Sequence, residues 1–221
     1  MLASSVAFVD LETTGTTASA DRVTEVGVVR VDDGMCVSEW STLVNPQCSI
    51  PAAIQALTGI DNAMVANAPT FAQIADGLAE RLRGCLFVAH NARFDYGFLK
   101  HEFGRLGHAF TAKVLCTVKL SRRLFTDFAR HNLDSLIERH RLPSLDRHRA
   151  LGDARILWAF VQALYRERPA DEIDARRFPT LHRLAAGLAQ DRWEGEFETG
   201  LDGMLDRIAI FVADGPDLRR D

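Results

Sequence analysis

The chain has 221 residues, of which 47% are hydrophobic and 25% are charged, a composition typical of a folded globular protein. Its net charge of -4 excludes a protein that is basic over its whole surface, so binding to a polyanion would require a local basic patch. The spacing of the four cysteines matches neither a C-x-x-C pair nor a zinc site, which favours reduced thiols; they are Cys36, Cys48, Cys85 and Cys116.

The first half of the chain predicts three strands and two helices. Strands are expected over residues 6–10, 22–31 and 37–44, because these segments are apolar and rich in Val. Short turns between them favour an antiparallel meander. Helices are expected over residues 50–59, with Pro51 early and Gly59 at the end, and over residues 70–82, where apolar side chains share one face.

Strands and helices then alternate up to about residue 166. Expected strands cover residues 86–90 and 114–117, and expected helices cover residues 95–106, 118–125, 132–140 and the greater part of 148–166. A meander followed by such alternation predicts an α/β domain with a mixed central sheet flanked by helices, ending near residue 166.

The remaining segment, residues 167–221, differs in character. It carries 8 Lys and Arg against 13 Asp and Glu, whereas the first 166 residues carry 18 against 17. We expect a charged linker around Pro169 and then two amphipathic helices, which form a C-terminal helical extension. The sequence has no basic leader and no apolar run near 18 residues, so we expect a cytoplasmic protein without a membrane span.

Acidic residues recur near the ends of three expected elements. Asp10 and Glu12 stand at positions i and i+2 at the end of the first strand, so both side chains point to the same side of the sheet. Two neighbouring buried carboxylates repel each other unless a cation lies between them, and Mg²⁺ prefers oxygen ligands. Taken one at a time, the three remaining residues have ordinary interpretations. Asp95 would cap a helix, Asp153 would be a solvated acid on a helix, and His148 would be a histidine in a surface loop. Each of these interpretations alone outweighs a catalytic role, but together they weaken, because the order, context and spacing of all five residues fit one known pattern.

Three motifs resemble those of the DEDD superfamily of 3′–5′ exonucleases, in its histidine-bearing DEDDh form. They read FVDLETTG at residues 8–15, HNARFD at 90–95 and HRALGD at 148–153. The resemblance extends over residues 6 to about 166 and is strongest to the DnaQ-like proofreading epsilon subunit of bacterial DNA polymerase III and its stand-alone homologues. It implies a three-layer ribonuclease H-like fold for a domain spanning residues 1–166.

The resemblance also implies an activity and a set of catalytic residues. The expected reaction is hydrolysis of phosphodiester bonds from the 3′ end of DNA, with two Mg²⁺ or Mn²⁺ ions and release of nucleoside monophosphates. Asp10 would bridge the ions, Glu12 and Asp153 would help to hold the ion that binds the attacking water, and Asp95 would hold the other. His148 would be the general base, placed by a loop that moves when substrate binds.

Substrate contacts are expected around the motifs. The backbone near Thr13 and Thr14 and the Thr13 side chain would approach the terminal nucleotide, and Phe98 would stack on its base, although Phe98 is equally consistent with a core position. Among the basic residues Arg122, Arg123, Arg130, Arg147 and Arg149, the two that flank His148 are favoured for contact with phosphates. His90 and Asn91 are expected to orient the second motif. The full expected set is Leu11, Thr13, Thr14, His90, Asn91, Phe94, Phe98, Arg147 and Arg149.

Two other functions stay open at this point: an exoribonuclease of the same family, and a non-catalytic module that binds nucleic acid or protein. The expected partner is the 3′ end of a single strand, with DNA favoured over RNA, and the resemblance is compatible with a polymerase partner. Residues 177–181 and 197–208 faintly resemble the last helices of TetR-type regulators, which implies a homodimer through the extension. A docked extension and a partner-binding arm are the alternatives.

Overall fold

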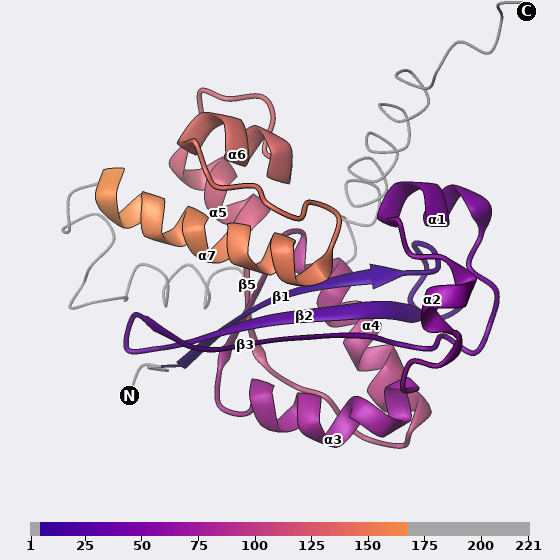
Figure 1. Ribbon diagram of the computed structural model, residues 1–221. Helices are drawn as coiled ribbons and strands as arrows, with labels where there is room; N and C mark the ends of the chain where they lie inside the picture. Colours follow the sequence, from indigo (N-terminus) through magenta and orange to yellow (C-terminus); the bar gives the residue numbers. More distant parts are fainter. Residues whose placement is uncertain (1–4, 168–221) are drawn as a thin grey trace, which may run out of the picture. The chain divides into compact units, whose positions relative to one another are not determined.

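A mixed five-stranded sheet forms the centre of the computed structural model, which describes residues 5–167 (Figure 1). The strand order is β3-β2-β1-β4-β5. The first three strands form an antiparallel meander, and the last two run parallel to β1. The strands are β1 (Ser5–Thr13), β2 (Val23–Asp32), β3 (Met35–Leu43), β4 (Leu86–Ala89) and β5 (Lys113–Cys116). The predicted mixed sheet is confirmed.

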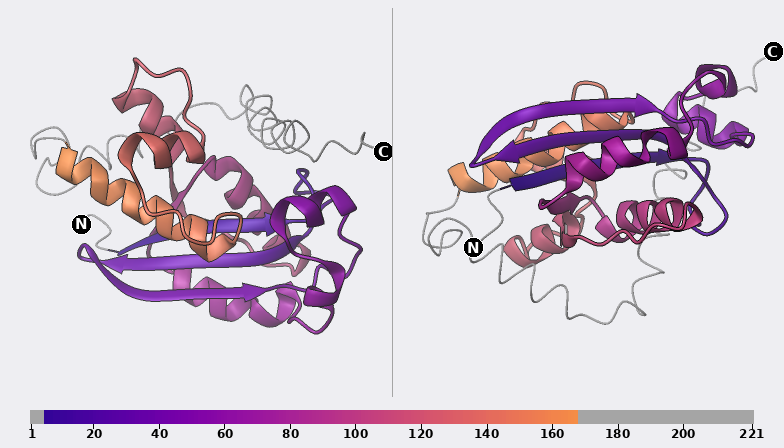
Figure 2. Two further views of the ribbon diagram at one scale, coloured as in Figure 1. Left: turned by 45° about the horizontal axis from the view of Figure 1, so that its top comes forward. Right: turned by 90° about the horizontal axis from the view of Figure 1, so that it is seen from below.

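Helices pack on both faces of the sheet, which gives the predicted three layers (Figure 2). One face is covered by α3 (Phe71–Leu82) and α4 (Ala92–Arg105), and the other by α5 (Thr117–Leu124), α6 (Leu133–His140) and α7 (Ala150–Glu167). Two short helices, α1 (Ala52–Thr58) and α2 (Asn62–Ala66), lie at the end of the sheet toward which β1 and β3 run. The sequence did not predict α2, which begins where the Asp61 side chain accepts a hydrogen bond from the Met64 N–H.

The central strand β1 divides its side chains between the two faces. Ala7, Val9 and Leu11 pack with α3 and α4, whereas Phe8 packs with α7. Because side chains alternate along a strand, the even-numbered positions after Phe8 also face α7. The end of β1 therefore presents its polar side chains to the layer that contains α7.

The N-terminus of α7 lies very close to β2. A Cβ atom on Gly27 would lie 2.2 Å from the carbonyl carbon of Ala150, so the helix can reach this position only above a glycine. The Glu25 carboxylate accepts a hydrogen bond of 3.0 Å from the Ala150 N–H, which satisfies a donor at the helix start. Since Gly27 pairs with Asp10 across the β1–β2 ladder, this packing places the first turn of α7 beside Asp10.

Helix α4 begins at Ala92, earlier than the expected start near residue 95. Asn91 adopts a left-handed conformation with φ of 60°, and this turn redirects the chain from β4 straight into the helix. Asp95 is therefore in the first turn and is not the N-cap residue.

No helix within residues 5–167 is both long and apolar enough to cross a bilayer. The predicted C-terminal helices and their TetR-like dimer interface fall in residues 168–221, outside the described residues.

Candidate metal centre

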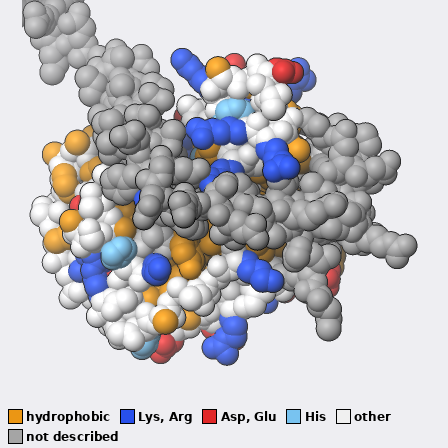
Figure 3. Space-filling view, turned by 180° about the vertical axis from the view of Figure 1, so that it is seen from behind, with side chains coloured by type: hydrophobic (Ala, Val, Ile, Leu, Met, Phe, Trp, Pro, Cys, Tyr) orange, Lys and Arg blue, Asp and Glu red, His pale blue; other side chains and the backbone are white. Residues whose placement is uncertain are grey.

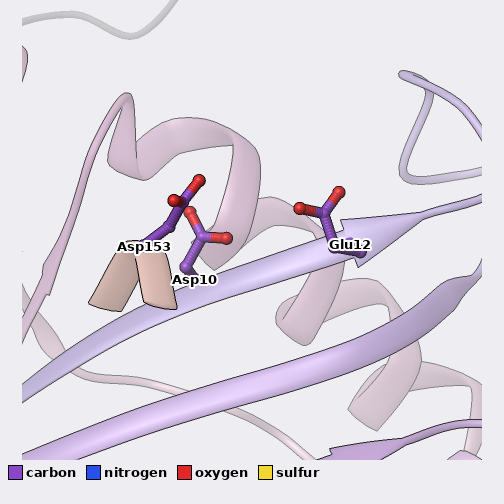
Figure 4. Close-up of side chains that lie close together, drawn as sticks. All are labelled: Asp10, Glu12 and Asp153. Carbon is purple, nitrogen blue, oxygen red and sulfur yellow. The ribbon is translucent and has the colours of Figure 1, made fainter. Parts of the chain in front are cut away.

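Three buried carboxylates meet on the α7 side of β1 (Figure 4). Asp10 and Glu12 come from the strand, and Asp153 comes from the first turn of α7. One oxygen of each lies within 4.8 Å of the others. The residues are 8%, 8% and 1% exposed, respectively. Within residues 5–167, these three form the acidic group whose geometry suits a shared cation.

The donor set of this trio fits a hard divalent cation. Asp153 Oδ1 is buried and has no hydrogen-bond partner among the described residues. A buried carboxylate oxygen without a donor is costly, and a bound cation would remove that cost. Three carboxylate oxygens are ligands that Mg²⁺ and Mn²⁺ accept. The resemblance of the motifs and the geometry therefore agree on divalent metal ions, and the trio consists of residues that the sequence predicted.

Arg147 is bound to the trio from the side. Its guanidinium donates to Asp153 Oδ2, and its Nε and Nη2 atoms donate to Asp134 Oδ1 at 3.0 and 2.6 Å. Burial lowers the pKa of Arg147, but the carboxylates of Asp153 and Asp134 more than offset this, so its pKa lies above the ordinary value. Because two carboxylates already occupy the guanidinium, the expected phosphate contact of Arg147 has no support from the structure.

Arg149 is also held by a carboxylate. Its Nε and Nη2 atoms donate to Glu25, with the shortest distance at 2.6 Å, and this hydrogen bonding is the main cause that raises the pKa of Arg149. Glu25 is 3% exposed and lies opposite Glu12 in the β1–β2 ladder. Arg149 thus neutralises a buried acid next to the trio, and its expected phosphate contact stays a prediction.

Asp95 is not one of the three clustered carboxylates. It is 2% exposed, and its Oδ1 accepts a hydrogen bond of 3.1 Å from the backbone N–H of Leu11. Leu11 stands between Asp10 and Glu12, and its side chain is buried in the core on the opposite face. Asp95 therefore fixes the backbone that carries two of the three carboxylates.

His148 lies in the loop before α7 and is half-buried. Its φ of 60° is in the left-handed region, as is that of Asp146 at 59°. Such conformations cost about 1–3 kcal/mol for non-glycine residues and are concentrated at functional sites. The Asp146 carbonyl oxygen also lies where a Cβ on Gly152 would be, at 2.1 Å, so the loop crosses closely over the first turn of α7. His148 as general base and the motion of its loop stay predictions.

Thr13 and Thr14 stabilise the turn after β1. The Thr13 hydroxyl donates to the Gly15 carbonyl at 2.6 Å, and the Thr14 hydroxyl accepts from the Arg22 N–H at 3.0 Å. Both side chains are buried. The structure is therefore compatible with a contact between the nucleotide and the backbone of these residues, but it gives no support for the expected contact of the Thr13 side chain.

The second motif forms the turn from β4 to α4. The Thr117 hydroxyl donates to the Ala89 carbonyl and lies 2.9 Å from His90 Nδ1, which agrees with the orienting role expected of His90. Phe98 is 1% exposed and packs on Phe94, with ring centroids 4.7 Å apart. A fully buried ring cannot stack on a base, so the structure favours the core position for Phe98. Phe94 is only partly buried.

The sequence did not predict the buried ion-pair network on the α4 side of the sheet. Glu102, 1% exposed, accepts from Arg22 at 2.9 and 3.2 Å and from the Val23 N–H at 3.2 Å, and it also pairs with Arg105 at 3.3 Å. Arg105 in turn donates to three carbonyl groups of residues 18–21. The network holds the segment that follows the first motif against α4.

Comparison with known proteins identifies the family. The family model described as Exonuclease (RNase_T) matches residues 7–161. The chain belongs to this exonuclease family. The family predicted from the three motifs is therefore confirmed.

Similar proteins agree with this family. The chain is 39% identical over 146 residues to the DNA polymerase III PolC-type protein of Caldanaerobacter subterraneus subsp. tengcongensis, a match that covers 66% of this chain and 10% of that protein. It is 36% identical over 179 residues to the 3′-5′ exonuclease DinG of Bacillus subtilis, covering 80% of this chain and 19% of that protein. The chain thus spans less than a quarter of the length of either relative.

Solved structures show the same fold. Exonuclease X, solved with 5′ overhanging duplex DNA, matches with a TM-score of 0.59 and 29% identity, covering 75% of this chain and 95% of that chain. Exonuclease I matches with a TM-score of 0.69 and 17% identity, covering 86% of this chain and 44% of that chain. The predicted ribonuclease H-like fold is confirmed.

Proposed function

We propose that this chain is a metal-dependent exonuclease that hydrolyses DNA from its 3′ end and releases nucleoside monophosphates. The observation that carries the proposal is the buried trio of Asp10, Glu12 and Asp153, whose oxygens converge within 4.8 Å. The 3′-5′ exonuclease name of the Bacillus subtilis relative supports the direction. The PolC-type relative and the DNA-bound Exonuclease X support DNA as the substrate and are compatible with a polymerase partner.

In the proposed mechanism, the acidic residues of the site bind the metal ions. Asp10, Glu12 and Asp153 would hold the metal ions, with Asp95 contributing from the α4 side. Two divalent ions, when bound, activate water and stabilise charge on the attacking and leaving oxygens. The hydrogen bond from Leu11 to Asp95 keeps the β1 carboxylates in register during the reaction.

His148 is the proposed general base. A neutral imidazole, with an ordinary pKa near 6.5, accepts a proton from the attacking water near neutral pH. His148 stands in a strained turn directly before the helix that carries Asp153, so a small change in that turn moves the imidazole relative to the trio. Comparing the position of this loop with and without a bound nucleotide tests the motion, and an imidazole already in contact with the trio in the free protein would contradict it.

The decisive test is the shortening of oligonucleotides labelled at either end. Single-stranded DNA and matched RNA are incubated with the wild-type chain and Mg²⁺ or Mn²⁺, beside the Asp10→Ala and His148→Ala variants. We expect stepwise shortening from the 3′ end, faster on DNA and lost in the Asp10→Ala variant. Loss of a general base slows such reactions by about 10² to 10⁴-fold, which is the expectation for His148→Ala.

The matched control is Glu80→Ala, which removes an exposed acid on α3. It should shorten DNA at the wild-type rate. If the wild-type chain shortens neither DNA nor RNA in the presence of metal, the proposal is refuted and a binding module is favoured. If it shortens RNA faster than DNA, the chain is an exoribonuclease.

A further inference from the structure

The end of α5 and the following loop form an exposed basic surface. Residues 119–132 contain four Lys and Arg but one Asp, although the whole chain has a net charge of -4. Arg122, Arg123 and Arg130 are exposed, and Phe128 is 49% exposed. Figure 3 shows Lys and Arg side chains on the upper part of the face seen from behind, where α5 and α6 lie. We call Arg122, Arg123, Phe128 and Arg130 the α5–α6 surface.

Contacts to α6 and α5 hold the exposed ring of Phe128 in place. The Arg139 guanidinium lies 3.9 Å from the ring centroid, in cation–π geometry. Arg139 also donates to the Arg130 carbonyl at 2.7 Å and to the Ser121 hydroxyl at 3.3 Å. The His131 ring nitrogen Nε2 lies 2.8 Å from the Phe128 carbonyl. The loop therefore presents an aromatic ring that is held in place but about half exposed to solvent.

This surface is connected to the candidate metal centre through the first turn of α6. β1, β4 and β5 are parallel, so α5 begins at the same edge of the sheet at which β1 ends. Asp134, in the first turn of α6, pairs with Arg147, which contacts Asp153. The chain between Phe128 and Asp134 is short, so they are separated by at most about 20 Å even if it is fully extended.

The charges of the surface are available for a ligand. Arg147 and Arg149, the arginines nearest to the metal centre, are bound to acids. In contrast, Arg122, Arg123 and Arg130 form no ion pair with any residue of the range 5–167. An open ring beside exposed arginines is the combination that binds unpaired strands, because bases stack on the ring while phosphates contact the cations.

We propose that the α5–α6 surface binds the unpaired strand upstream of the 3′ nucleotide, with a base stacked on Phe128. This inference deepens the proposed function, because it identifies the substrate as an unpaired DNA or RNA strand several nucleotides long. Paired bases do not offer an open face to Phe128, so a blunt duplex is expected to bind more weakly than a single strand.

The binding test uses the full chain carrying Asp10→Asn, which prevents hydrolysis during the measurement. Fluorescence anisotropy reports the affinity for a 20-nucleotide DNA strand, the same RNA strand and a blunt DNA duplex over a range of salt concentrations. The control for Phe128→Ala is Met35→Ala, which also removes an exposed hydrophobic side chain. The control for the double variant Arg122→Ala/Arg123→Ala is Arg83→Ala/Lys100→Ala, which removes two cations on the α3 and α4 side. Thermal unfolding of each variant shows whether it is folded.

We expect Phe128→Ala to weaken single-strand binding about fivefold to a hundredfold, the range found for loss of one base–aromatic contact. The double arginine variant should reduce the slope of log affinity against log salt by about 1.4, because two phosphate contacts are lost. Phe128→Trp should retain tight binding, since it keeps a stacking ring. The DNA and RNA arms show which sugar the surface accepts.

Hydrolysis gives an independent readout on a chain with Asp10 intact. The ratio of kcat/KM on the 20-nucleotide strand to that on a dinucleotide should fall in Phe128→Ala and in the double arginine variant. The inference would be overturned if kcat/KM fell equally on the strand and on the dinucleotide. It would also be overturned if the variants bound the single strand as tightly as the wild type does, if the control variants lost as much affinity, or if the blunt duplex bound as tightly as the single strand. A wild-type chain that binds strands through this surface but hydrolyses none would refute the proposed activity alone.

Discussion

The two oxygens of Asp153 have different surroundings, and this difference prepares the carboxylate for a cation. Oδ2 accepts from Arg147, whereas Oδ1 is buried without a donor among the described residues. Arg147 is in turn held by Asp134, so the orientation of the carboxylate is fixed by a second acid on α6. The positive charge of Arg147 also reduces the repulsion within the trio when no cation is bound.

Arg147→Gln is expected to weaken the binding of Mn²⁺ about 10-fold, because groups that orient a metal ligand typically contribute 10- to 100-fold to affinity. Isothermal titration of the full chain with Mn²⁺ measures the effect. Arg83→Gln, which removes an exposed arginine far from the trio in sequence, is the control and should bind as the wild type does. Unchanged or tighter binding in Arg147→Gln would show that Arg147 does not position Asp153.

His148→Ala should separate metal binding from proton transfer. His148 is not one of the three clustered ligand residues, so we expect the Mn²⁺ affinity to stay within about twofold of wild type. The rate of hydrolysis should fall by about 10² to 10⁴-fold, and the acidic limb of the pH–rate profile should disappear. A large loss of metal affinity in this variant would instead assign His148 to the metal.

The sequence predicted the acidic residues of the site but not the residues that neutralise them. The i and i+2 spacing of Asp10 and Glu12 determines that both face α7, because strand side chains alternate. The pairing of Arg149 with Glu25 depends on how α7 packs on β2, and no local pattern reports that packing. Phe98 was ambiguous for the same reason, since tertiary contacts decide which face of α4 is buried.

At the scale of elements, the site depends on the close packing of α7 against β2. The carboxylate of Asp153 reaches Asp10 because Gly27 lets the first turn of α7 approach the sheet and Glu25 binds its first free N–H. The predicted strands and the long helices agree with the structure, because their hydrophobic periodicity is strong. The short helix α2 and the early start of α4 depend on single residues, Asp61 and Asn91, and were missed.

Gly27→Ala is expected to destabilise the fold by about 1–3 kcal/mol, because the added methyl overlaps the backbone of Ala150. Because α7 must shift, binding of Mn²⁺ should weaken as well. Urea unfolding and Mn²⁺ titration measure the two effects. Gly97→Ala is the matched control: no atom lies within 4 Å of its added Cβ, and alanine should stabilise helix α4 by about 0.5–1 kcal/mol. Equal stability of the two variants would contradict the packing account.

The loop between α5 and α6 is expected to lose stability in acid. Burial lowers the pKa of His131 below its ordinary value, the hydrogen bond with the Phe128 carbonyl opposes this, and the nearby Arg139 and Arg122 lower the pKa further. The unfolded chain therefore binds a proton more readily than the folded chain, so folding stability falls as the pH drops through the ordinary histidine pKa of about 6.5 and levels off below the folded pKa. Urea unfolding of the wild type and His131→Gln at pH 7.5 and pH 5.5 tests this. If the free energy of unfolding falls between pH 7.5 and pH 5.5 by as much in His131→Gln as in the wild type, His131 does not cause the loss of stability in acid.

At the scale of the whole molecule, the described domain and the acidic remainder of the chain are proposed to have separate roles. Residues 1–166 would form the nuclease, and the extension that follows would mediate self-association, as its faint resemblance to dimerisation helices implies. We expect light scattering after size exclusion to give about twice the chain mass of 24.5 kDa for the full chain, and a monomer for residues 1–166. Monomer masses for both would contradict a dimer and leave a docked extension or a partner-binding arm.

The crossing of α7 over β2 also determines when a newly made chain can assemble its candidate metal centre. Asp10 lies in β1 and is synthesised well before Asp153, which belongs to the last helix of the described domain. A chain interrupted anywhere before α7 carries two acids and lacks the third. Chains that end before this helix therefore cannot assemble the trio, so the proposed activity requires α7 to be present and folded.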